Sequence, residues 1–468
     1  MGTRRLRGAP VVGSLAERGW ELRWRVALTG LVAMALAVVS AQPAQGATIQ
    51  VPCSVPSLIG AIDTANGTVG ADTLNLASGC TYILVARDNA FNGLPVITSE
   101  ITINGSGATI ARASSAPSFR ILAVSSAGIL TLNRLTVSGG LADADCPNPF
   151  PTICGGGIAS RGTLTVKASR LIDNTATGSV AGFGPLGGAV ANAPEATVTL
   201  TNSEVSGNTV GNTGTGSANG GGIGSNGSLT IISSRVADNT LSTTSCVTAC
   251  GFGAGINSFG FATLRNSIVS GNTASTPGGL LRAAGIVNGG SMAITGTAIR
   301  NNRASAPGGF ITGGGIATGA ALSMTSSIVS DNTATAQGGT VEGAGISVGP
   351  FGTLTVNTSA VRGNSGSASA GTVSGGGIAN LLGGTVTTKQ STISNNAASA
   401  PGGTAKGGGI FHAVGATTLN GSAVTGNSAG DGGGIYKASG TVTLSDSVVR
   451  TNAPNNCSPP GSISGCAG

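Results

Sequence analysis

Acidic side chains are the first residues in this sequence to test for chemistry, because Asp and Glu act as general acids, general bases and cation ligands. Five of them precede a recurrent asparagine, namely Asp173, Glu204, Asp238, Asp331 and Asp446. Hydrolytic carboxylate pairs need a separation of about 5 to 10 Å. Several sequence repeats separate Asp173, Asp238 and Asp331. We therefore expect no catalytic pair among them.

Two further groups of residues invite a functional interpretation. Asp143 and Asp145 are close enough in sequence to bind a cation, although two acids on a loop are more often simply solvated. His412 is the only histidine, and no nucleophile or carboxylate lies near it in sequence. We expect it to be hydrogen-bonded or solvent-facing, and we predict no catalytic, cofactor-binding or metal residue.

Aromatic side chains, which often form the platforms of sugar-binding sites, are scarce in this sequence. Both tryptophans lie in the first 25 residues, and the two tyrosines are Tyr82 and Tyr436. One local cluster exists, consisting of Phe252, Phe259 and Phe261. We expect this cluster to fill the interior of its repeat.

A recurrent glycine-rich motif, which we call the glycine phrase, sets the positions of all of these residues. It first appears as Gly155-Gly156-Gly157-Ile158 and returns every 25 to 33 residues. Its apolar residue falls at Ile158, Val190, Ile223, Ile256, Ile286, Ile316, Ile346, Ile378, Ile410 and Ile435. Such a period predicts a stacked array in which each unit buries its apolar face against its neighbours. Glycine suits a corner that needs positive φ or close backbone approach, and the Ile or Val then points inward.

Short runs of alternating apolar and polar residues between the glycine phrases, such as Leu164-Thr165-Val166, predict strands with one face inward. About three short strands per repeat are typical of a parallel β-helix. We therefore predict an all-β parallel β-helix, a solenoid of about ten regular coils with irregular N-terminal coils and caps. The segments between the asparagines and the next glycine phrase, such as 175–186 and 240–250, are expected to be loops along one side.

One asparagine recurs in every coil. These residues are Asn174, Asn208, Asn239, Asn272, Asn302, Asn332, Asn364, Asn396, Asn427 and Asn452. Asn tolerates left-handed turns, and its amide can hydrogen-bond in both directions along a stack. A ligand-contacting role is the alternative, but a binding residue has no reason to recur in every coil. We predict a structural ladder of asparagine side chains.

Two motifs, Gly187-Gly188-Ala189-Val190 and Ile172-Asp173-Asn174, resemble the Gly-Gly-Ala-Ile and Phe-x-x-Asn signature of the polymorphic outer-membrane protein repeats. The family's Phe is replaced here by Ile, Leu or Val. The segment between Cys53 and Tyr82 is similar to the N-terminal motif of many secreted bacterial β-helix proteins. The resemblance implies a right-handed, pectin-lyase-like β-helix that is exported to the cell surface or beyond.

The leader and the termini set the expected domain boundaries. A basic segment and the apolar run 26–39 precede small residues, which is typical of a cleaved secretory signal peptide; an uncleaved membrane anchor is the alternative. We predict a signal peptide at 1–47, an N-terminal cap with a short helix and irregular coils at 48–140, repeats at 141–452, and a C-terminal cap at 453–468. We expect no membrane-spanning segment in the mature chain.

The eight cysteines agree with export, because disulfides persist in oxidising compartments. Close sequence neighbours favour four local bridges, although 105 pairings are formally possible. These pairs are Cys53 with Cys80, Cys146 with Cys154, Cys246 with Cys250, and Cys457 with Cys466. A metal site is the weaker alternative, since no Cys-x-x-Cys spacing occurs and there is one histidine.

The charge of the chain argues against nucleic acid as a partner. Its formal net charge is +7, but six arginines and two glutamates in the first 25 residues leave only +3 for the remainder, scattered along the chain. We predict a secreted or cell-surface protein with a structural or adhesive role, needing no cofactor. Extracellular polysaccharide and the envelope surface are the candidate partners. The alternative is a polysaccharide lyase or hydrolase of the pectin-lyase-like class.

Overall fold

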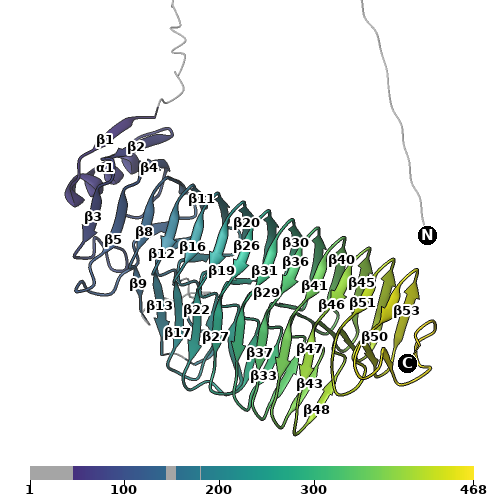
Figure 1. The fold of residues 1–468 in the computed structure, drawn as a ribbon. Coiled ribbons are helices and arrows are strands. Elements are labelled where there is room, and N and C mark those ends of the chain that lie inside the picture. Colours follow the sequence, from purple (N-terminus) through teal and green to yellow (C-terminus); the bar gives the residue numbers. More distant parts are fainter. Residues whose placement is uncertain (1–45, 144–153, 180, 468) are drawn as a thin grey trace, which may run out of the picture. The chain divides into compact units, whose positions relative to one another are not determined.

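The computed structural model describes residues 46–143, 154–179 and 181–467. The predicted signal peptide therefore lies almost wholly outside the described residues, as do Asp145 and Cys146. The described chain is a parallel β-solenoid of about eleven turns with a single helix, as predicted from the repeats. Figure 1 shows the turns stacked in sequence order from purple to yellow. No described helix is long and apolar enough to cross a membrane.

Each central turn contains five short strands, where the sequence had predicted about three. One such turn consists of β25 Phe261–Arg265, β26 Ile268–Ser270, β27 Thr273–Ser275, β28 Leu280–Arg282 and β29 Ile286–Asn288. Each strand pairs in parallel with its counterpart in the next turn. The turns thus generate five sheets, which we call S1 to S5 in the order of β25 to β29.

The five sheets differ in length. S1 has 14 strands, S2 has 13, S3 has 9, S4 has 7 and S5 has 12. S1 runs from β1 Thr48–Val51 to β53 Thr441–Ser445, and S2 runs from β3 Thr81–Leu84 to β54 Val448–Arg450. S3 runs from β9 Leu141–Ala142 to β47 Ala397–Ser399, and S4 runs from β18 Ala218–Asn219 to β48 Thr404–Lys406. S5 runs from β6 Leu122–Val124 to β55 Cys457–Ser458. S3 and S4 therefore add to the turns only after the first coils.

Sheets S3 and S4 occupy the segments that the sequence had predicted to be loops. Within 175–186 and 240–250, the structure has β13 Thr175–Gly178 and β22 Thr240–Thr243. These strands are built mainly from Thr, Ala, Ser and Gly, and alanine and glycine are depleted in ordinary strands. Stacking supplies what local propensity lacks, because each strand pairs with equivalent strands in adjacent turns.

The turns that contain S3 and S4 enclose two separate hydrophobic cores. S1, S2 and S5 surround a main core of Ile, Leu and Val, including Leu264, Val269 and Ile286. S3 and S4 surround a second core in which Ala predominates, including Ala274 and Leu281. The asparagine turn connects S2 to S3, and the glycine phrase connects S4 to S5. These two connections meet between the cores and form a waist in every regular turn.

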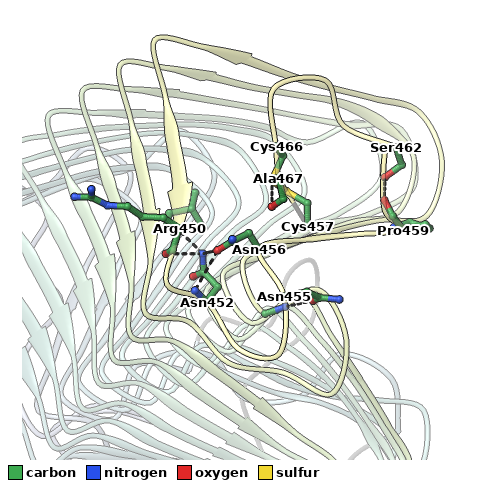
Figure 2. Close-up of a disulfide and its surroundings, with 11 residues drawn as sticks. Arg450, Asn452, Asn455, Asn456, Cys457, Pro459, Ser462, Cys466 and Ala467 are labelled. Carbon is green, nitrogen blue, oxygen red and sulfur yellow. Dashed lines mark hydrogen bonds between the residues drawn. A yellow bond between two sulfur atoms is a disulfide. The ribbon is translucent and has the colours of Figure 1, made fainter.

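Both ends of the main core are covered. Helix α1, Val55–Gly67, includes the predicted cap segment 57–66 and adds Leu58 and Ile62 to the main core. At the other end, Ile463 is buried in the same core, beside the disulfide between Cys457 and Cys466. Figure 2 shows this C-terminal loop folded back over the last turn. The two caps shield core side chains at the ends of the described stack.

Three of the predicted cysteine pairs form disulfides in the structure. They join Cys53 to Cys80, Cys246 to Cys250, and Cys457 to Cys466, with Cα atoms 5.7, 5.3 and 6.2 Å apart. Cys154 is also disulfide-bonded. Its predicted partner, Cys146, lies outside the described residues. No described cysteine is a free thiol.

Candidate functional site: the groove between S4 and S5

The recurrent asparagines are buried and form a continuous chain of side-chain hydrogen bonds. Each Nδ2 donates to the Oδ1 of the next asparagine, at 2.8 to 3.1 Å from Asn174 through Asn452. The last member, Asn452, donates instead to Asn456 Oδ1 at 3.2 Å (Figure 2). These amides are paired with one another inside the solenoid. We therefore look elsewhere for a binding surface.

The acidic residues named from the sequence are dispersed. Asp173, Asp238 and Asp331 each precede a ladder asparagine with φ between 54° and 56°. The Oδ1 atom of each aspartate packs against a glycine of the next turn, so close that a Cβ atom on that glycine would clash with it. These glycines are Gly207, Gly271 and Gly363, respectively. This contact accounts for glycine at the equivalent position of the turn that follows each of these aspartates.

The remaining acids do not converge either. Glu204 lies in β16, Glu204–Ser206, and pairs with Arg170 at 2.9 Å. Burial raises its pKa, but hydrogen bonds from Ser206 and Arg170 outweigh this, so that the pKa lies below its usual value. Asp446 lies at a different corner, between β53 and β54. The described residues contain no group of three or more His, Cys, Asp or Glu able to hold a metal.

His412 is fully buried in the third position of β49, Ile410–His412. Its Nδ1 lies 2.9 Å from Thr417 Oγ1 and 3.3 Å from Asn380 Nδ2. Burial, with a smaller effect from Lys437, lowers the pKa of the imidazole. His412 is therefore a neutral, hydrogen-bonded core residue, one of the two roles expected from the sequence.

A groove lies on the outside of the waist between S4 and S5, and the sequence had not indicated it. Its volume is about 290 Å³. The floor includes Val287, Ala317 and Ser347, the second residues of successive S5 strands. The wall includes Arg282, Thr312 and Glu342, the third residues of successive S4 strands. The same two strand positions recur in the following turns, at Ser374 and Lys406 on the S4 side and at Ala379 and Phe411 on the S5 side.

The S5 column that supplies the floor leads to two aromatic rings in later turns. Beyond Ser347, the column continues through Ala379 to Phe411 and Tyr436. The Phe411 and Tyr436 rings are stacked, with centroids 5.7 Å apart and 9° between their planes. Lys406 Nζ lies 4.3 Å from the Tyr436 ring centroid and donates to its hydroxyl at 2.8 Å. This end offers an aromatic and cationic surface.

The opposite end of the groove has a similar combination. Arg282 lies over the Phe252 ring, 5.7 Å from its centroid, and Phe252 is 6.4 Å from Phe259. The expectation that the phenylalanine cluster fills a coil interior is wrong, since Phe259 and Phe261 are exposed. Phe259 lies in the turn between S5 and S1, and Phe261 occupies an outward-facing position at the start of β25. A cation over an aromatic face gains about 0.5 to 1 kcal/mol at an exposed site.

Charged groups recur at every second turn along the groove wall. The third S4 positions read Arg282, Thr312, Glu342, Ser374 and Lys406. With turns about 4.8 Å apart, the neighbouring charges are about 10 Å from one another. Burial raises the pKa of Glu342 to about 7. Among the described residues it has no ion-pair partner.

The groove residues share a sequence signal that is visible once the fold is known. Wall residues stand immediately before the glycine phrase, as in Glu342-Gly343 and Lys406-Gly407, and floor residues stand immediately after its Ile, as in Ile410-Phe411. A comparison of the residues at equivalent positions of every repeat would have identified them. A search for chemically reactive side chains, by contrast, directs attention to the acidic residues at the asparagine turn.

The fold and this surface define the chain as a parallel β-solenoid with a long external groove. Comparisons with protein-family models, with curated proteins and with solved structures found no match to the chain. The suggested kinship with polymorphic outer-membrane protein repeats and with pectin-lyase-like proteins is therefore left as a resemblance.

Proposed function

We propose that this chain is an exported, non-catalytic β-solenoid that attaches to an extended extracellular glycan through the groove between S4 and S5. The observation that carries the proposal is the groove itself, which has small residues in its floor and polar and charged side chains along one wall, with aromatic rings in the adjoining turns. Ligand sites are typically concave and mostly apolar, with a few polar groups that fix orientation.

The spacing of the groove favours a glycan over a peptide. Equivalent side chains repeat about every 4.8 Å along the stack, which is close to one sugar step in an extended glycan, whereas an extended peptide advances about 3.3 Å per residue. The floor residues Ala317 and Ser347 have small side chains, which leave the groove open above them. Phe411 supplies an aromatic face at the end of that floor.

Export is supported by the leader and by the disulfides. The sequence begins with a basic segment followed by an apolar run, and the three described bridges require an oxidising compartment to persist. A structural or adhesive role follows from a rigid stack that exposes one binding surface over many turns.

The alternative, a polysaccharide lyase or hydrolase, draws on a single observation. With its pKa near 7, Glu342 is suited to general acid–base work. Its nearest described acid along the S4 wall is Asp431, three turns away and so about 14 Å distant. Carboxylate pairs of glycosidases are about 5 to 10 Å apart. Attachment without cleavage is therefore the stronger proposal.

The test is a binding screen of the purified mature protein on immobilised plant, bacterial and matrix glycans. We expect retention on at least one glycan, abolished by Ala317→Phe, which fills the floor, and weakened by Phe411→Ala. Phe183→Ala is the matched control, because Phe183 is exposed outside this groove. Retention that survives Ala317→Phe would sink the groove assignment, and release of reducing or unsaturated sugars would favour the enzyme.

A further inference from the structure

A second concave surface lies at the corner between S2 and S3. The waist is formed by the asparagine turn and the glycine phrase, so the S2–S3 corner and the S4–S5 groove lie on opposite sides of it. The corner contains an open hollow of about 510 Å³. Its lining includes three arginines, Arg235, Arg300 and Arg303.

One of these arginines is held in place by neighbouring groups. Arg235 donates from Nη2 to Asp238 Oδ2 at 2.7 Å and from Nη1 to Ser270 Oγ at 3.3 Å. Arg300 and Arg303 are exposed and form no ion pair with any described residue. Three arginines stand against Asp238 in the lining and Asp331 one turn beyond Asn301, so the net charge here is 3 − 2 = +1.

The two unpaired arginines are not required by the fold. In the S2 column, Arg300 is flanked by Ser270 and Ser330, and in the S3 column, Arg303 is flanked by Thr273 and Thr333. The stack thus accepts Ser or Thr at both positions. The stretch from Asn239 to Ser330 also contains four arginines and no Asp or Glu, in a chain with only 8 % charged residues.

We propose that the S2–S3 hollow is a second binding site, which takes the anionic groups of an acidic polysaccharide. Guanidinium groups bind sulfate and carboxylate oxygens through paired hydrogen bonds, and Arg235 presents a fixed donor about two turns from Arg300. The described surface near the hollow lacks the interleaved aromatic platforms that single-stranded nucleic acids use. With the groove on the opposite side, the solenoid can hold two polymer chains at once.

The experiment measures binding of the full mature protein to dextran sulfate, polygalacturonate and neutral dextran at low salt. The test variant is R300S/R303T, which installs the residues of the adjacent turns. The control is K167T/R450S, which removes two positive charges outside the lining of the hollow and introduces residue types found at the same strand positions elsewhere in the stack, at Thr201 and Ser394. Circular dichroism melting confirms that each variant folds.

We expect R300S/R303T to weaken binding of one or both acidic polymers by about tenfold, with K167T/R450S near the unaltered protein. The polymer that is affected identifies the anion as sulfate or carboxylate. Equal losses in both variants, or no binding of either acidic polymer, would overturn the site. Duplex DNA that binds more tightly than both polymers and depends on Arg300 and Arg303 would overturn the polysaccharide assignment. Glycan retention through the groove is scored separately with Ala317→Phe, so the two proposals fail independently.

Discussion

Gly315 contacts the side chain of Asn332 across the interior of one turn. A Cβ atom on Gly315 would lie 2.8 Å from Asn332 Nδ2 and 2.7 Å from the carbonyl oxygen of Gly345 in the next turn. The third glycine of the phrase has the same relationship to the ladder asparagine in other turns, as at Gly285 with Asn302 and Gly377 with Asn396. The two recurrent motifs of the sequence are therefore two halves of one packing contact.

Gly315→Ala should destabilise the solenoid, because its methyl group has no space between the ladder and the next turn. We expect a loss of about 1 to 3 kcal/mol in the free energy of unfolding, measured by chemical denaturation. The control is Gly338→Ala, since a Cβ there meets nothing within 4 Å. An equal effect of the two substitutions would contradict the steric role of Gly315.

Asn332→Ala tests the stabilising role of the ladder. Asn332 Oδ1 accepts from Asn302 N at 3.0 Å and from Asn302 Nδ2 at 2.8 Å, so truncation leaves buried donors without an acceptor. We expect a loss of about 1 to 3 kcal/mol in unfolding free energy. Thr335→Ala, an exposed change in the same turn, is the control. Unchanged stability of Asn332→Ala would refute a stabilising ladder.

The solenoid was predictable because its signals repeat. Ile158 and its equivalents are all buried in the main core, as their phase indicates. The second core was not predictable from the same signals, since strands such as Thr273-Ala274-Ser275 have neither length nor apolar character. Their pairing is entirely between turns, and local propensity carries little information about such contacts.

Glu342 should make stability depend on pH. Its pKa is about 7 in the folded state against 4.5 for the free side chain, so between these values the folded chain holds a proton that the unfolded chain has lost. Stability should therefore fall as the pH rises from about 4.5 through 7 and then level off. The full loss is at most on the order of 3 kcal/mol.

Glu342→Gln removes this titration. We expect the variant to melt at a higher temperature than the unaltered protein at pH 8, with little difference at pH 4.5. The control is Glu195→Gln, because Glu195 lies on an exposed turn. Parallel pH profiles for Glu342→Gln and the unaltered protein would show that the Glu342 carboxyl is not responsible.

The candidate site was less accessible to sequence reasoning than the fold. Lys406 and Tyr436 are 30 residues apart, and nothing local to either indicates that they form a hydrogen bond. Phe411 directly precedes His412 in the sequence, yet adjacent strand residues point to opposite faces, so Phe411 faces outward while His412 lies in the core. Spatial neighbours in a solenoid are one period apart, and only an established register reveals them.

The disulfide between Cys457 and Cys466 should protect the last turn from opening. It closes a loop of nine residues' separation beside the buried Ile463, and cross-linking a loop of this size contributes about 2 to 3 kcal/mol. Among the described strands, none pairs with the outer edges of β53 and β54, so loss of the cap should expose this end of the main core. In C457S/C466S we expect faster amide hydrogen exchange in β53 and β54 and unchanged exchange in β25.

Replacing Cys53 and Cys80 by serine is the matched control, because it should accelerate exchange only near β1. Exchange that accelerates evenly along the whole stack in C457S/C466S would show that the bridge stabilises the solenoid globally and does not act as a local cap.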